Sequence, residues 1–212
     1  MGRPDKPLIS RERAAKAALD VIDTKGLGSL SLELVARQLG VKAPSLYYHF
    51  KDKHELLCEV ALCILRDVRL GSANFNDWEQ TMIDLCVATR RTILLHPNAA
   101  PLLLDVFPRH IFPRAYEFWM DKCPYPAEYH LMVLEETEKI TYGSALFAAA
   151  SRSRGIAPMP DLDQRKFPAL TRAIRANTND EEAIFIGVLK IFFAGVRAAA
   201  ETDGKASPVR PR

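Results

Sequence analysis

The sequence predicts an all-α protein in which a group of short N-terminal helices precedes a body of longer ones. Apolar residues recur at the three- and four-residue spacing of amphipathic helices along most of the chain. Glycines and prolines divide these stretches into segments of helical length. No segment shows the alternation of apolar and polar residues that is typical of a half-buried strand.

The first four helices each have a recognisable start or end. Ser10, Ser31 and Asp52 are suitable N-caps, and Pro44 fits the first turn of a helix, where its missing N–H has no intrahelical partner. Gly40 stands where a left-handed residue ends a helix. The predicted helices cover about residues 10–26, 31–39, 43–50 and 53–70.

Six further helices follow, punctuated mainly by prolines. They are expected at about residues 77–96, 98–106, 113–122, 127–151, 161–175 and 181–200. The domain organisation that follows is a flexible arm (1–9), a head (10–53), a body (54–201) and a disordered tail (202–212).

The composition is that of a soluble globular chain. Its 212 residues are 48% hydrophobic and 26% charged, which is too apolar for a disordered protein. We expect no membrane partner, because no apolar run approaches the roughly 20 residues of a membrane span. The N-terminus lacks the layout of a signal peptide, so a cytoplasmic protein with four free cysteine thiols is expected.

The formal net charge of +3 conceals an asymmetry. Residues 1–53 carry 10 Lys+Arg against 6 Asp+Glu, whereas residues 54–212 carry 19 against 20. The positive excess therefore lies entirely in the first quarter of the chain. It indicates either a basic tail or a small head that binds a polyanion, and charge alone does not decide between them.

Two short helices joined by a tight turn at Gly40 are typical of a helix-turn-helix. Leu46 and Phe50 are the expected apolar anchors of the second helix. The residues expected on its exposed side include two tyrosines and a histidine, Tyr47, Tyr48 and His49. Such side chains suit contacts with phosphates and bases.

Residues 31–41 (SLELVARQLGV) and 45–57 (SLYYHFKDKHELL) resemble the DNA-binding signature of TetR-family transcriptional regulators. The resemblance covers about residues 10–60. Beyond them the chain is similar to the family in length and helical content, with a looser likeness at residues 78–108 to the tetracycline-repressor ligand domain. The resemblance implies a homodimer whose subunits each have a three-helix DNA-binding head and a helical body that binds a small ligand and dimerises.

The resemblance also implies which residues meet double-stranded DNA. Lys53 has independent physical support, because a lysine in the first turn of a helix opposes the macrodipole yet can bind phosphate there. Glu33 departs from the family pattern, since a basic or small polar residue is common at its position. Its carboxylate either accepts from cytosine or simply favours the helix N-terminus. The expected DNA-binding residues are Ser31, Lys42, Ala43, Pro44, Ser45, Tyr47, Tyr48, His49 and Lys53.

The body contains more apolar and aromatic residues than one buried stripe per helix requires. Together with the resemblance, this surplus predicts a mostly hydrophobic pocket for an apolar or aromatic effector. No cofactor or metal is expected, because no His/Asp/Glu cluster has ligand spacing. Arg90 and Arg91 are candidate polar contacts. The expected lining is Leu103, Phe107, His110, Phe112, Tyr116, Trp119, Tyr142 and Phe147.

Two long predicted helices, at about residues 127–151 and 181–200, are candidates for a homodimer interface. The last is apolar around most of its circumference, and small residues occur in both helices, which lets backbones approach closely. The alternative is that they form a buried core within one chain. The expected interface residues are Gly143, Phe185, Leu189, Phe192 and Val196.

These patterns predict a ligand-responsive DNA-binding regulator, most simply a repressor that its effector releases from a palindromic operator. The alternative is a ligand-binding helical protein without specific DNA binding, which Glu33 would favour. An enzyme is not expected, because the sequence has no Gly-x-Ser-x-Gly motif, phosphate-binding glycine loop or metal-ligand set.

Overall fold

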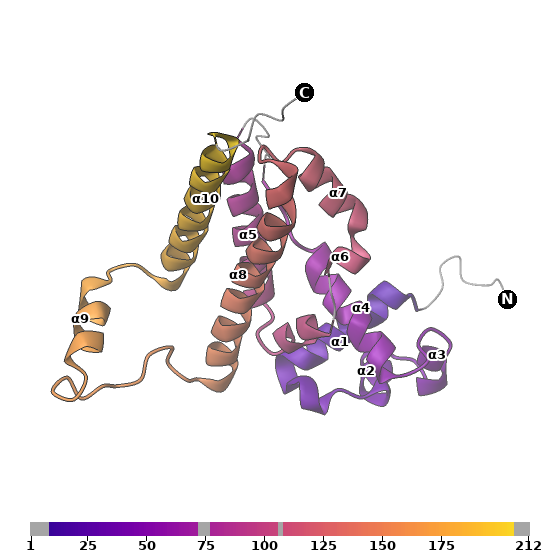
Figure 1. Ribbon diagram of the computed structural model, residues 1–212. Helices are drawn as coiled ribbons and strands as arrows, with labels where there is room; N and C mark the ends of the chain where they lie inside the picture. Colours follow the sequence, from indigo (N-terminus) through magenta and orange to yellow (C-terminus); the bar gives the residue numbers. More distant parts are fainter. Residues whose placement is uncertain (1–8, 72–76, 106–107, 206–212) are drawn as a thin grey trace, which may run out of the picture.

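The computed structural model describes residues 9–71, 77–105 and 108–205, and every regular element within them is helical. The N-terminal helices form the head of the molecule, at the lower right of Figure 1. Their bounds are α1 Arg11–Lys25, η1 Leu27–Ser29, α2 Leu32–Gln38, α3 Ala43–Tyr47 and α4 Lys53–Arg66.

The body is built on three long helices that lie side by side, with shorter helices beside them (Figure 1). Helix α9 stands away from the body on a long connection (Figure 1). The bounds are α5 Trp78–Leu94, η2 Ala100–Leu104, α6 Pro108–Ile111, α7 Pro113–Asp121, α8 Ala127–Arg154, α9 Pro168–Ala176 and α10 Glu181–Lys205.

The predicted N-caps of the head make the expected hydrogen bonds. The Ser10 hydroxyl accepts from the Arg13 N–H at 3.2 Å, and the Ser31 hydroxyl accepts from the Leu34 N–H at 3.1 Å. Each bond satisfies a backbone donor that the first turn of a helix leaves without a partner. These side chains therefore determine where α1 and α2 begin.

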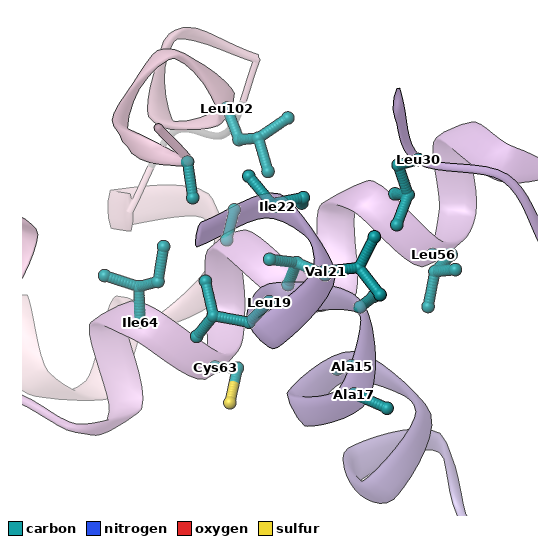
Figure 2. Close-up of a cluster of buried hydrophobic side chains, with 14 of the residues drawn as sticks. Ala15, Ala17, Leu19, Val21, Ile22, Leu30, Leu56, Cys63, Ile64 and Leu102 are labelled. Atoms are coloured by element: carbon teal, nitrogen blue, oxygen red, sulfur yellow. The ribbon is translucent and has the colours of Figure 1, made fainter. Parts of the chain in front are cut away.

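The core of the head lies between α1 and α4. Figure 2 shows Val21 and Ile22 of α1 facing the α4 side chains Leu56 and Ile64. The same apolar cluster continues into the body, where Leu102 of η2 lies beside α1. Because this apolar packing is continuous from the head into the body, it does not mark where one domain ends and the next begins. The predicted boundary between residues 53 and 54 therefore stays a prediction.

A second core holds the far end of the body together. Trp78 of α5 makes edge contacts with Trp119, Tyr125 and Phe193, and its indole N–H donates to the Trp119 carbonyl at 3.1 Å. The inner face of α10 is buried against this cluster. Aromatic pairs of this geometry add to the free energy gained from apolar burial.

Several helix bounds differ from the prediction. Helix α4 ends at Arg66 rather than near residue 70, and α3 ends at Tyr47 rather than Phe50. The apolar stretch from residue 98 is a 3₁₀ helix that covers only Ala100–Leu104. At the end of α3, tertiary contacts override local helix propensity. Phe50 is buried in the core although it lies beyond the last residue of the helix.

The last two helices also differ from the prediction. Helix α9 begins at Pro168, seven residues after Asp161, because proline suits the first turn of a helix. Helix α10 continues to Lys205, so residues 202–205 of the expected tail are helical, whereas residues 206–212 lie outside the described part. The arm, apart from Ile9, lies outside it too.

The sequence predicted no membrane-spanning segment, because no uninterrupted apolar run is long enough, and helix α10 differs from that expectation. It is the one helix among the described residues that is long and apolar enough to cross a membrane, judged by length and composition alone. Only 22% of its most apolar stretch is buried within the chain. Monomeric soluble proteins rarely leave so apolar a helix face exposed.

Gly40 provides a test of the turn between α2 and α3. Its φ of 70° lies in the left-handed region, although a Cβ there would meet no atom within 4 Å. We predict that Gly40→Ala lowers the free energy of unfolding by about 1–2 kcal/mol through backbone strain alone. Gly28→Ala is the control, with equal space and no positive φ, and should stay within about 0.5 kcal/mol. Urea unfolding followed by circular dichroism measures both, and equal losses would contradict the prediction.

Candidate nucleic-acid interface and ligand cavity

Helix α3 presents a polar and aromatic face to solvent. Leu46 is fully buried beneath it, whereas Tyr48 is 89% exposed and Tyr47 about half exposed. Lys42, Pro44 and Ser45 at its start are exposed as well, and Ala43 and His49 are half-buried. The predicted DNA-binding residues of α3 therefore share one end of the head, which can enter a groove of suitable width.

Arg11 of α1 fixes the end of α3. Its guanidinium donates to the His49 carbonyl at 2.5 Å and to the Glu55 carboxylate at 2.7 Å, and it lies over the Phe50 ring at 4.6 Å. One side chain thus connects α1 to the end of α3 and to the start of α4. The prediction from sequence missed this residue, because its hydrogen-bond partners are 38 to 48 residues away in the chain.

The turn before α4 is held by reciprocal capping. The Asp52 carboxylate accepts from the Glu55 N–H at 2.8 Å, and the Glu55 carboxylate accepts from the Lys51 N–H at 2.7 Å. Lys53 is exposed at the first position of α4, where the backbone N–H groups and its own charge both favour an anion.

Helix α2 supplies two further residues to the head. Ser31 is half-buried, and its hydroxyl is used as the N-cap. Glu33 is exposed in the first turn, where a negative charge favours the helix dipole. That position accounts for Glu33 without any contact to a base.

A cavity of about 280 Å³ lies in the body, between the end of α4, α5, the α6–α7 segment and α8. Most of its wall is apolar, with aromatic rings contributed mainly by α7. Its lining is Leu65, Val68, Met82, Leu85, Cys86, Thr89, Pro108, Phe112, Ala115, Tyr116, Trp119, Met120, Leu134, Thr137, Glu138, Thr141 and Tyr142.

The carboxylate in the cavity wall is neutralised by its neighbours. Glu138 accepts a hydrogen bond from the Tyr116 hydroxyl at 2.5 Å and pairs with the Arg109 guanidinium at 2.7 Å. Burial, with Glu138 as the second cause, raises the pKa of Tyr116, so its phenol stays protonated near neutral pH. Burial also raises the pKa of the Cys86 thiol to about 11, which keeps this thiol neutral.

The structure brings together only part of the predicted lining. Phe112, Tyr116, Trp119 and Tyr142 do line the cavity. Leu103 does not, because it is buried in the core shared with the head, and Phe147 does not, because it is 83% exposed on another face of α8. Phe107 and the side chain of His110 lie outside the described part of the chain.

The predicted polar contacts Arg90 and Arg91 also lie outside the cavity. Arg90 is 2% exposed and pairs with Glu181 at 3.1 Å, whereas Arg91 donates to the carboxylate of Glu182. Both arginines therefore connect α5 to the first turn of α10. The acidic side chains in the first turn of α10 also interact favourably with the dipole of that helix.

The predicted interface residues of α10 lie mainly on the face that the chain itself covers. Phe185, Leu189 and Val196 are buried inside the chain, and Phe192 packs against the same core. The exposed face of α10 carries Ile184, Val188 and Ile191 instead. A helix that is apolar all round does not reveal from sequence which side faces its own chain. Gly143 of α8 is half-buried.

The head and the body also meet through polar contacts. The Asp23 carboxylate at the end of α1 lies 2.6 Å from His96 Nδ1, in the turn after α5. The Asn98 amide donates to the Asp23 carbonyl at 3.0 Å. These contacts place the turn beside α1, so that η2, which follows it, packs between the head and α8.

Comparisons with known proteins agree with this architecture. Residues 15–60 match the family model described as bacterial regulatory proteins, tetR family. The chain is 25% identical over 194 residues to the tetracycline repressor protein class E of Escherichia coli, covering 87% of this chain and 90% of that protein.

A second curated relative is similar over a shorter stretch. An HTH-type transcriptional regulator of Saccharopolyspora erythraea is 32% identical over 97 residues, which is 46% of this chain and 41% of that protein. Among solved structures, the TetR family protein ActR of Streptomyces coelicolor in complex with actinorhodin superposes with a TM-score of 0.73. It is 23% identical, and the match covers 92% of this chain and 99% of that one.

Glu55 provides a test of the contacts that hold the end of α3 and the start of α4. The Lys51 N–H first, and Arg11 second, hold the pKa of Glu55 below its ordinary value of 4.5. A lowered pKa means that the folded state favours the ionised form, so this stabilisation is present above pH 4.5 and is lost as the pH falls below it.

We predict that Glu55→Gln is less stable than wild type at pH 7 and loses less stability than wild type between about pH 5 and pH 3. Urea unfolding followed by circular dichroism at several pH values measures this difference. Parallel pH dependences of the two proteins would contradict the prediction.

Proposed function

This chain belongs to the tetR family of bacterial regulatory proteins, and we propose that it is a ligand-responsive DNA-binding transcriptional regulator that acts as a homodimer. The observation that carries the proposal is the exposed face of α3, with Tyr47 and Tyr48, together with Lys53 exposed at the first position of α4. The body cavity supplies the second requirement, a site for a small molecule.

We assign the DNA contacts as follows. The start of α3 enters the major groove, where Lys42 and Ser45 meet base edges or phosphates and Ala43 and Pro44 offer apolar contact. Tyr47, Tyr48, His49, Ser31 and Lys53 bind the backbone or adjacent base edges. In a symmetric dimer the two recognition helices read half-sites about 34–36 Å apart, which makes the operator a palindrome.

The packing supports a route from the cavity to the head. Leu65 of α4 lines the cavity, and the same helix begins at Lys53 on the proposed DNA face. Pro108 also lines the cavity, four residues after η2 ends against the head. A ligand that binds one arrangement of these elements more tightly changes the angle or spacing of the two heads. Release from the operator, and hence repression, is the simplest outcome.

The effector is proposed to be small and mostly hydrophobic or aromatic. The cavity is lined by apolar side chains and aromatic rings, and its carboxylate is neutralised. ActR, which shares this fold, was solved with actinorhodin bound, and the class E relative is a tetracycline repressor. These relatives support an aromatic ligand for this chain as well.

The exposed apolar surface supports the homodimer. Phe147 of α8 and Ile184 and Val188 of α10 line a groove of about 570 Å³ between the two helices, and Ile191 next to it is 74% exposed. The segment around α9 exposes further apolar side chains away from the body. A second copy that covers this surface would bury a face too apolar for a monomer.

Footprinting on the DNA that flanks its own gene tests the proposed function. A protected palindrome, released by a cavity ligand, supports it. Gel-shift competition separates specific from random DNA, and equal competition by both at low salt would favour a ligand-binding protein without specific DNA recognition.

Lys53 provides a quantitative test of the phosphate contact. We predict that Lys53→Ala weakens binding to every DNA sequence and reduces the salt slope of log K by about one per subunit that contacts DNA. Lys122→Ala is the control and should leave the slope unchanged, because it removes an equal charge at the end of α7, in the body rather than the head. Fluorescence anisotropy across a salt series measures both slopes, and an unchanged slope for Lys53→Ala would exclude the contact.

Ile191 provides a test of the homodimer. We predict that Ile191→Glu converts a dimer of two 23.8 kDa chains into a monomer, because it places a charge in the apolar face that the second copy would cover. Leu104→Glu is the matched control, since Leu104 is also exposed but lies on η2. Light scattering after size-exclusion chromatography gives the masses, and a dimeric Ile191→Glu would remove this face from the interface.

A further inference from the structure

Helix α8 presents a buried hydroxyl to the cavity that lacks a hydrogen-bond partner. Thr141 lines the cavity and is 3% exposed, and no group within the described residues forms a hydrogen bond with its Oγ1. Its polar neighbour in the wall is the Cys86 thiol, whose weak interaction with this hydroxyl slightly offsets the rise that burial causes in the pKa of the thiol. A thiol is a weak donor and acceptor, so this contact leaves the Thr141 hydroxyl without a full hydrogen bond.

Other threonines of the long helices do form hydrogen bonds through their side-chain hydroxyls. Thr137, one turn earlier on α8 and also in the cavity wall, donates to the Val133 carbonyl at 2.6 Å. On α5, Thr89 and Thr92 donate in the same way to carbonyls four residues back, at 2.8 and 2.9 Å. This back-bonding is the usual way in which a helical threonine satisfies its hydroxyl in an apolar setting.

A buried hydroxyl without a hydrogen bond lowers the stability of the folded chain. A ligand that forms this hydrogen bond would remove that cost. Tyr142, the next residue, also lines the cavity, and burial raises its pKa, so its phenol stays a neutral donor. Glu138, the one charged residue in the described wall, is paired with Arg109. The described wall therefore offers hydroxyl groups but no unpaired charge.

We propose that Thr141 is the polar anchor of the effector site, and that the effector is an uncharged aromatic molecule whose hydroxyl or carbonyl oxygen binds this hydroxyl. The inference rests on the proposed function only in treating the cavity as the effector site. It adds the chemical class of the ligand and the residue that selects it.

Three naphthalene-based probes in the full chain test the anchor: naphthalene, 2-naphthol and 2-naphthoate. Quenching of tryptophan fluorescence reports binding, because Trp119 lines the cavity. We expect 2-naphthol to bind about tenfold more tightly than naphthalene and at least tenfold more tightly than anionic 2-naphthoate.

Paired variants separate the anchor from its helix. Thr141→Val, which keeps the shape and removes the hydroxyl, should reduce the preference for 2-naphthol over naphthalene to threefold or less. Thr137→Val should keep the preference, since that hydroxyl is already bonded to its own helix. Thr141→Ser, which keeps the hydroxyl, should also keep the preference. Thr141→Ala removes the hydroxyl and serves in place of Thr141→Val if the valine variant fails to fold, with the same expected loss of preference.

Thermal unfolding without ligand gives an independent readout. Thr141→Val should raise Tm by about 2–4 °C, because it removes an unpaired buried hydroxyl, whereas Thr137→Val should not raise it. An undiminished naphthol preference in Thr141→Val, an equal loss in Thr137→Val, or no binding of any probe would overturn the proposal.

The two proposals fail in different ways. Probe binding is measured without DNA, so an anchor that depends on Thr141 can be found even if no operator is protected. Conversely, specific DNA binding with a naphthol preference that is independent of Thr141 would overturn the anchor and leave the proposed function standing.

Discussion

The packing of α1 against α4 is the contact on which the rest of the structure depends. Helix α4 begins at Lys53 on the proposed DNA face, buries Leu56 and Ile64 against α1, and ends with Leu65 in the cavity wall. One helix thereby belongs to both functional regions. Because closely packed interiors transmit displacement rather than absorb it, any tilt of α4 that a ligand imposes reaches the head.

Polar contacts fix the orientation of the helices that this apolar packing brings together. Arg11 holds the end of α3 through a backbone carbonyl, a carboxylate and an aromatic ring, while Asp23 holds the turn before η2. Helix α1 therefore contacts the recognition helix at one end and the body at the other. The apolar core supplies most of the stability, and these directional contacts fix the angle at which the head meets the body.

Helix α10 shows how one sequence pattern can serve two surfaces. Its inner face, with Phe185 and Leu189, completes the core around Trp78, and its outer face, with Val188 and Ile191, remains exposed. A side chain that is buried in the core of its own chain cannot also contact a second copy. The proposed dimer face is therefore the face that the chain leaves uncovered. The proposed role of Thr141 in the cavity has the same basis, since no group of the described residues satisfies its hydroxyl.

The sequence by itself determined the all-α class, the helix starts at Ser10 and Ser31, the turn at Gly40 and the exposed tyrosines of α3. These features depend on spacing and capping within a few residues, which are local properties of the chain. Only the tertiary structure decided that Leu103 belongs to the core, that Phe185 faces inward and that Arg11 holds α3. Each of these depends on contacts between distant segments, and an apolar residue carries no mark of which neighbour will bury it.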